Sequence, residues 1–173
     1  RAGDGAVRVT VTPGLYTGLH PIVDHLVKAT PSTKSCVAAV PATACTVTGL
    51  TNGTSYTFTA VTRTASVSSA ASAPSAPLVA ARPPVRLAAP TVVSAGPGAA
   101  TLTWLPSTYE GGLPVTSYEV MVGNGPTVAC RATALTCTVT GLVKGTSYWF
   151  TVVAINDAGR SANSPGSVVF KAA

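Results

Sequence analysis

The chain is built from short runs in which apolar and polar residues alternate, separated by glycine- and proline-containing turns. In the C-terminal half this pattern predicts seven strands, at residues 91–94, 100–105, 116–122, 127–131, 136–140, 147–156 and 167–171. No long stretch carries the 3.6-residue period of an amphipathic helix. The pattern therefore predicts an all-β protein with antiparallel sheets.

Alternation along these strands also predicts which side chains point into a core. In the C-terminal half the expected inward residues are Leu102, Trp104, Tyr118, Val120, Tyr148, Phe150 and Val152. The corresponding residues of the N-terminal half are Val9, Val11, His25, Val27, Tyr56, Phe58 and Ala60.

The two halves are copies of one sequence. A shift of 92 residues aligns residues 45–59 with residues 137–151, and a shift of 93 aligns residues 9–13 with residues 102–106. We therefore expect one module at residues 1–80, a proline-containing linker at residues 81–89 and a second module at residues 90–173. The prolines favour an extended, semi-rigid linker.

The first module is expected to lack its opening strand, because the repeat places the counterpart of residues 91–94 just before Arg1. The strand that carries Val7, Val9 and Val11 would then have an unpaired edge, which is a template for strand addition. Preceding residues of a longer polypeptide or a neighbouring subunit would supply the missing strand. If residues 2–6 pair as a strand themselves, the first module is simply shorter.

Several residues together resemble the fibronectin type III family. They are an inward tryptophan in the second strand (Trp104), the Pro-Val-Thr-Ser-Tyr run at residues 114–118, and Gly-Leu-x-x-Gly-Thr-Ser-Tyr at residues 49–56 and 141–148. The first copy departs from the pattern, with Val11 in place of the tryptophan and His25 in place of Tyr118. The resemblance implies two tandem immunoglobulin-like, seven-strand antiparallel β-sandwiches of a bacterial extracellular type, the alanine-, threonine- and valine-rich composition favouring bacteria.

Four cysteines recur as one pair in each repeat, which favours two disulfide bonds, Cys36 with Cys45 and Cys130 with Cys137. A zinc site would need four converging ligands, and neither pair is accompanied by further cysteine or histidine at finger-like spacing. Because disulfides persist in oxidising compartments, we expect a secreted protein or one on the cell surface.

Charge does not indicate a nucleic-acid partner. Although the net charge is +6, only 9% of residues are charged and the basic residues occur singly, without interleaved aromatics. The uncharged run at residues 35–62 is too polar to insert into a membrane.

We find no pattern typical of an enzyme. His20 and His25 flank Asp24, but the repeat places His20 in a turn and His25 on an inward strand position, so they should not converge on a metal. The carboxylates are scattered, and no phosphate loop or nucleophile elbow is present. We expect no catalytic residues, no metal and no cofactor.

Three aromatic residues are candidate partner contacts. Alternation sends Trp149 to the outer face, where it would stack on a sugar, bury into another protein, or lie flat under side chains of adjacent strands. Tyr109 and Tyr16, in the loops after the second strands, are weaker candidates.

These observations favour a non-catalytic structural or spacer module pair of a secreted or surface protein, whose partners are neighbouring domains of a longer chain. The alternative is a module that binds protein or polysaccharide, or that assembles with other copies of itself into an extracellular fibre.

Overall fold

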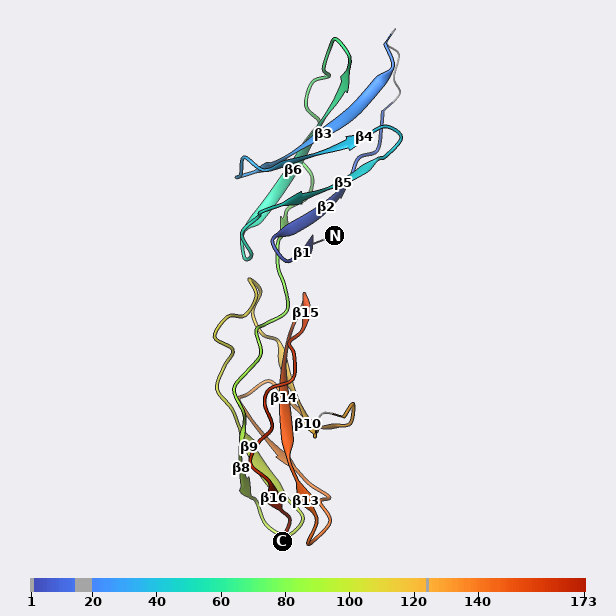
Figure 1. The fold of residues 1–173 in the computed structure, drawn as a ribbon. Helices are drawn as coiled ribbons and strands as arrows, with labels where there is room; N and C mark the ends of the chain where they lie inside the picture. Colours follow the sequence, from blue (N-terminus) through green and yellow to red (C-terminus); the bar gives the residue numbers. More distant parts are fainter. Residues whose placement is uncertain (1, 15–19, 124) are drawn as a thin grey trace. The chain divides into compact units, whose positions relative to one another are not determined.

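The computed structural model describes residues 2–14, 20–123 and 125–173, and every element in it is a β-strand (Figure 1). The chain divides into two compact units, Arg1–Arg82 and Pro83–Ala173. Among the described residues no helix is long and apolar enough to cross a membrane.

Unit 1 has two antiparallel sheets, in the orders β1-β2-β5 and β4-β3-β6-β7. Its strands are β1 (Ala2–Gly3), β2 (Ala6–Thr10), β3 (Ile22–Thr30), β4 (Ser35–Ala39), β5 (Ala44–Thr48), β6 (Ser55–Thr64) and β7 (Leu78–Val79).

Unit 2 repeats this arrangement, with sheets in the orders β12-β9-β8, β11-β10-β14-β15 and β13-β16. Its strands are β8 (Thr91–Ser94), β9 (Ala100–Thr103), β10 (Ser117–Val122), β11 (Val128–Ala132), β12 (Thr136–Val139), β13 (Ser147–Tyr148), β14 (Phe150–Asn156), β15 (Gly159–Arg160) and β16 (Phe170–Lys171). The predicted all-β tandem sandwich is thereby confirmed. The single strand predicted at residues 147–156 is interrupted at Trp149.

Each unit has its own apolar core, made largely of the residues that alternation predicted to point inward. In unit 2 the core includes Leu102, Trp104, Tyr118, Val120, Phe150 and Val152. In unit 1 it includes Val7, Val27, Val47, Tyr56 and Phe58, with Val9, Val11 and Ala60 partly buried against it. Val11 and Ala60 are smaller than Trp104 and Val152, the residues at the equivalent positions of unit 2. They therefore contribute less side-chain volume to the core of unit 1.

The same tyrosine hydrogen bond closes the turn before the long strand in both units. The hydroxyl of Tyr56 accepts a hydrogen bond from the Thr51 N–H, and that of Tyr148 accepts one from the Val143 N–H, each at 3.0 Å. This tyrosine corner is a recurrent feature of immunoglobulin-like sandwiches.

A serine at every third position lines the segment that follows the long strand of each unit. In unit 2 the N–H groups of Ser161, Ser164 and Ser167 donate to carbonyls of β14. Each serine Oγ in turn accepts from the N–H of the same β14 residue, at 2.9–3.1 Å. Ser69, Ser72 and Ser75 make the equivalent bonds to β6 in unit 1. The predicted last strand, residues 167–171, is therefore regular only at β16.

The opening strand of unit 1 is present but short, which corrects the expectation that it is missing. Ala2 and Gly3 form β1 and pair with Val7 and Ala6. The reversal at Asp4 and Gly5 is allowed because Gly5 adopts a positive φ of 56°. In unit 2, by contrast, all four residues of β8 pair with β9.

The proline-containing segment packs on unit 2. The Val85 N–H donates to the Tyr109 carbonyl at 2.9 Å, and Ser107 Oγ donates to the Val85 carbonyl at 3.0 Å. Leu87 is 2% exposed and belongs to the core of unit 2. Residues from Pro83 onward thus belong to the second unit, and the boundary falls between Arg82 and Pro83.

Candidate functional site

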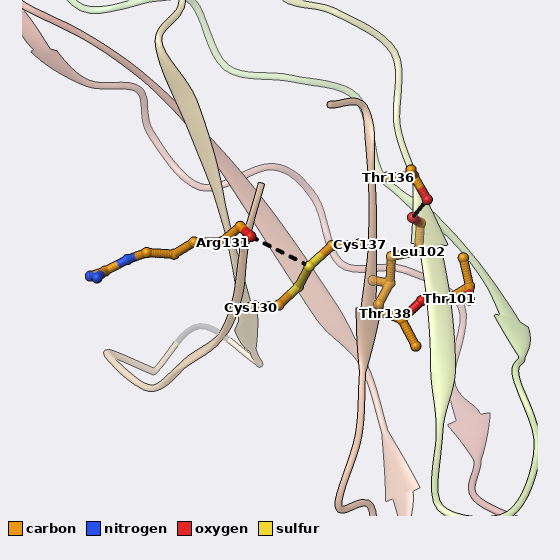
Figure 2. The surroundings of a disulfide bond; sticks show 7 residues. All are labelled: Thr101, Leu102, Cys130, Arg131, Thr136, Cys137 and Thr138. Atoms are coloured by element: carbon orange, nitrogen blue, oxygen red, sulfur yellow. Dashed lines mark hydrogen bonds between the residues drawn. A yellow bond between two sulfur atoms is a disulfide. The ribbon is translucent and has the colours of Figure 1, made fainter. Parts of the chain in front are cut away.

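Two disulfide bonds, Cys36–Cys45 and Cys130–Cys137, confirm the pairing predicted from the repeat. Figure 2 shows the second bond, whose Cys137 Sγ also lies 3.9 Å from the Arg131 carbonyl oxygen. Each bond joins the edge strand of one sheet to an edge strand of the other, β4 to β5 and β11 to β12. The disulfides therefore tie the two layers of each sandwich together.

The chain-entropy model gives these bonds a modest stabilising effect. The bridged cysteines are 9 and 7 residues apart. Loops of this length limit the gain to about 2.5 kcal/mol for each bond, because a short loop restricts the unfolded chain only slightly.

The side chain of Trp149 is partly exposed and partly packed against the chain. It is 37% exposed, so part of the indole ring faces solvent. The rest lies against two glycines: a Cβ placed on Gly123 would stand 3.3 Å from the ring, and one on Gly166 would stand 2.7 Å from it. The Gly123 N–H also donates to the Trp149 carbonyl at 2.8 Å. Trp149 is thus a partly exposed aromatic whose ring packs closely against two glycines.

Of the two tyrosines predicted as partner contacts, the structure describes Tyr109 but not Tyr16. Tyr109 is 40% exposed in the loop between β9 and β10, where its carbonyl accepts the bonds from Val85 and Ser107. Its backbone therefore holds the loop while its side chain stays accessible. Tyr16 lies outside the described residues.

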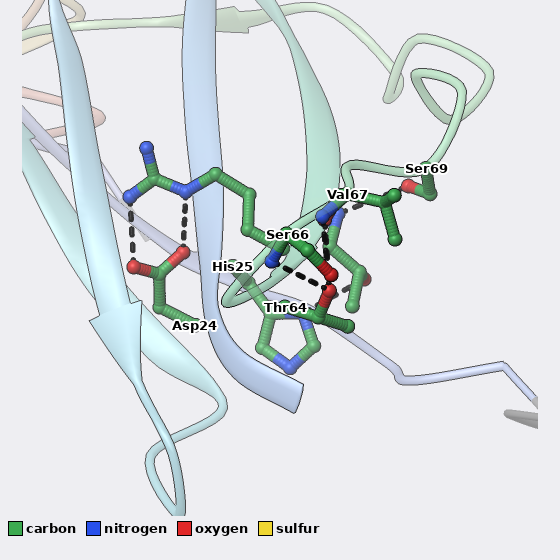
Figure 3. Close-up of polar contacts among 8 residues, drawn as sticks. Asp24, His25, Thr64, Ser66, Val67 and Ser69 are labelled. Carbon is green, nitrogen blue, oxygen red and sulfur yellow. Dashed lines mark hydrogen bonds and ion pairs between the residues drawn. The ribbon is translucent and has the colours of Figure 1, made fainter. Parts of the chain in front are cut away.

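The three residues His20, Asp24 and His25 do not form a common site. Asp24 pairs with Arg63, and the imidazole ring of His25 is buried. Arg63 Nε and Nη2 donate to the two carboxylate oxygens of Asp24, at 2.6 and 2.8 Å; Figure 3 shows Asp24 and these two bonds. The hydrogen bond from Arg63 lowers the pKa of Asp24 below its ordinary value. His25 is 2% exposed, and its Nδ1 lies 3.0 Å from Thr62 Oγ1. His20 is exposed at the start of the segment before β3.

A second carboxylate site was not found from the sequence. The side chain of Glu119 on β10 is 6% exposed and pairs with Arg131 of β11 (Nε to Oε1, 2.9 Å) and with Arg160 of β15. Alternation places Glu119 on the outer face, and strand pairing sets it opposite Arg131. Opposite charges on directly paired residues of neighbouring strands would have indicated this ion pair. Which residues are paired is known only from the register of the strands, so the sequence alone did not reveal it.

Within the part of the chain that the structure describes, no three histidine, cysteine or acidic side chains are grouped as a metal site would require. The Asp24 and Glu119 carboxylates are instead held in ion pairs with arginines. These groups link neighbouring strands on the sheet faces.

Residues 83–170 match the family model for the fibronectin type III domain, and the chain belongs to this family. The fold of the family is generally a non-catalytic module. Its members are typically structural, spacer or binding modules of multidomain proteins, in which they mediate protein interactions.

One solved structure of a multidomain chain shows the same fold over nearly the whole length of this protein. A crystal structure of a run of titin domains aligns with 99% of this chain at 18% identity and a TM-score of 0.66, covering 60% of that chain. The structure of titin kinase and its flanking domains aligns with 53% of this chain at 26% identity (TM-score 0.47) and is covered over 17% of its own length. The FN1–FN3 domains of chicken CNTN1 align with 100% of this chain at 19% identity (TM-score 0.43) and are covered over 64%. The chain thus spans less than two thirds of each of these proteins.

Proposed function

We propose that the two units are a non-catalytic spacer in a secreted or cell-surface bacterial protein, where they hold neighbouring domains of a longer polypeptide apart. The observation that carries the proposal is one disulfide in each sandwich, joining its two sheets at equivalent positions. Such bonds persist outside the reducing cytosol and stabilise small domains where the conditions are harsh.

The charged residues on the sheet faces are consistent with a non-catalytic role. The Asp24–Arg63 pair and the Glu119 pairs with Arg131 and Arg160 use charged side chains to link strands, so these carboxylates are committed to structure. The serine segments bond to the long strand of each unit through both backbone and side chain. Each sandwich is thereby closed by bonds within itself.

Size and thiol measurements test the spacer. Sedimentation equilibrium across a wide concentration range should give the mass of one chain, and peptide mapping without reduction should recover both disulfides from material isolated from its natural source. A concentration-dependent ladder or filament, or free thiols in the natural protein, would contradict the proposal.

The second candidate function is a binding or assembly module that contacts a protein, a polysaccharide or further copies of the chain. Trp149, which is 37% exposed, favours it, because its ring packs against Gly123 and Gly166 and so loses little entropy on binding. Tyr109 offers a further aromatic in the same unit. Glycan screening and the same sedimentation series distinguish this role from a pure spacer.

A further inference from the structure

The outer face of the sheet β11-β10-β14-β15 in unit 2 carries a row of charged side chains. Glu119 of β10 is the register partner of Arg131 on β11 and of Val153 on β14. Arg160 of β15 lies one strand further along, and its side chain reaches the Glu119 carboxylate across β14. One carboxylate thus serves two guanidinium groups, so this row keeps a net positive charge.

Arg131 keeps hydrogen-bond donors that a ligand can use. Its Nε donates to Glu119 Oε1 at 2.9 Å, and its side chain is 72% exposed. Figure 2 shows this side chain extending away from the disulfide of its strand. Because the bond to Glu119 uses Nε, the Nη1–Nη2 end of the guanidinium group remains available to a second carboxylate, which it binds through two parallel hydrogen bonds.

The arginine of the corresponding ion pair in unit 1 is less open. Arg63 uses both Nε and Nη2 on the two carboxylate oxygens of Asp24, and its side chain is 37% exposed. That pair matches one arginine with one carboxylate, so it leaves no excess charge. The open guanidinium end and the excess charge are therefore features of unit 2.

Trp149 lies on the same face of unit 2, at the end of the sheet. The Gly123 N–H, just after β10, donates to the Trp149 carbonyl at 2.8 Å. Alternation places Trp149 and Val153 on one face, four residues or about 13 Å apart along the chain. Between them lie the paired residues Met121 and Thr151, which are 4% and 0% exposed. The face therefore has a partly exposed aromatic ring at one end and the charged row at the other, with buried side chains between them.

We propose that this face binds an acidic polysaccharide, with a sugar ring stacked on Trp149 and a uronate carboxylate of the same polymer on the Nη1–Nη2 end of Arg131. The proposal rests on the binding role given above as the second candidate function, and it adds the charge of the ligand. An aromatic ring stacks on the apolar face of a sugar, and an arginine fork matches a carboxylate. A polymer suits the face because its rings and carboxylates recur along one line and so reach both ends.

Two forms of one polymer test the proposal on the full chain. Polygalacturonate carries a carboxylate on every sugar, and its fully methyl-esterified form has the same sugars without the charge. Isothermal titration gives the dissociation constant for each form. We expect the parent chain to bind polygalacturonate at least about tenfold more tightly than the ester, because a hydrogen bond to a charged group contributes about that factor or more.

Arg131→Gln should remove most of this difference and leave binding of the ester unchanged. Arg160 still pairs with Glu119 in this variant, so the fold should persist, which circular dichroism checks. Arg131→Lys keeps the charge but loses the planar fork, so it should restore only part of the affinity for polygalacturonate.

Arg63→Gln is the matched control, because it removes the same charge from an ion-paired arginine of unit 1. It should leave the affinities for both polymers unchanged, which separates a site on unit 2 from a general attraction between a basic protein and a polyanion. Trp149→Thr should lower the affinities for both forms, because each form offers the ring a sugar to stack on.

Equal affinity for the two polymers, no binding of polygalacturonate, or equal losses in Arg131→Gln and Arg63→Gln would overturn the inference. If Trp149→Thr weakens binding of the ester while Arg131→Gln leaves polygalacturonate binding intact, the binding role stands and the acidic ligand is wrong. Binding of poly-glutamate that depends on Arg131 but not on Trp149 would assign the face to an acidic protein and overturn the inference as well.

Discussion

A Cβ placed on Gly166 would stand 2.7 Å from Cε3 of Trp149. This is closer than real Cβ contacts come, so the glycine is what allows the indole ring to lie on the serine segment. Gly166 has no positive φ, and its role is therefore the space it leaves.

Gly166→Ala should destabilise unit 2 by about 1–3 kcal/mol, because the added methyl forces the ring or the backbone to move. Urea unfolding followed by tryptophan fluorescence measures the change. Gly125→Ala is the matched control, since a Cβ there would meet the Val122 carbonyl at an ordinary 3.6 Å. Equal stability of the two variants would show that the ring can shift freely.

Trp149→Thr, which installs the residue of the first copy, should leave the fold intact. If the second candidate function holds, it should also weaken binding to a glycan or to another copy. The cost in stability should stay below the about 3–5 kcal/mol of truncating a core tryptophan, because Trp149 is 37% exposed. Unfolding, iodide quenching and sedimentation are compared with the parent chain. Unchanged association and unchanged glycan binding would remove Trp149 as a partner contact.

Ser164→Ala should cost about 1–3 kcal/mol, because it leaves the buried N–H of Val152 without the Oγ at 2.9 Å. Ser72→Ala removes the equivalent hydrogen bond from the Ala60 N–H. That bond lies in an exposed position where water can replace the serine, so its loss should cost less. Chemical unfolding of the two variants compares them directly. A larger loss for Ser72→Ala would contradict the role of burial in this pair of sites.

Asp24→Asn should lower the stability of unit 1 at neutral pH and have little effect in strong acid. The hydrogen bond from Arg63 lowers the pKa of Asp24 in the folded state, so its contribution is complete above the unfolded value near 3.8 and is lost as the pH falls through the lowered value. Thermal unfolding of parent and variant over this acidic range measures the difference. Asp157→Asn, at an exposed turn, is the control for the change of aspartate to asparagine itself.

Replacing Cys36 and Cys45 together by serine should lower the free energy of unfolding of unit 1 by about 2.5 kcal/mol, through the larger entropy of the open unfolded chain. The matching change at Cys130 and Cys137 should affect unit 2 by a similar amount, since the loops are of similar length. Calorimetry resolves the two transitions. A loss confined to one unit whichever pair is removed would contradict independent folding of the units.

The sequence alone determined the local features of this protein. Alternation predicted most strands and the inward side of Leu102 and Phe150, because a strand turns successive side chains to opposite faces whatever surrounds it. The repeat paired the cysteines correctly, because equivalent positions in two copies of one fold have equivalent neighbours.

Only the tertiary structure decided what depends on distances across the sheets. The short β1, the burial of Glu119 between two arginines and the glycines that pack against Trp149 all follow from register and packing. Alternation gives the face on which a side chain lies, but it does not give the residue of another strand that comes to lie opposite. That choice is made when the strands pair, and it sets which charges meet.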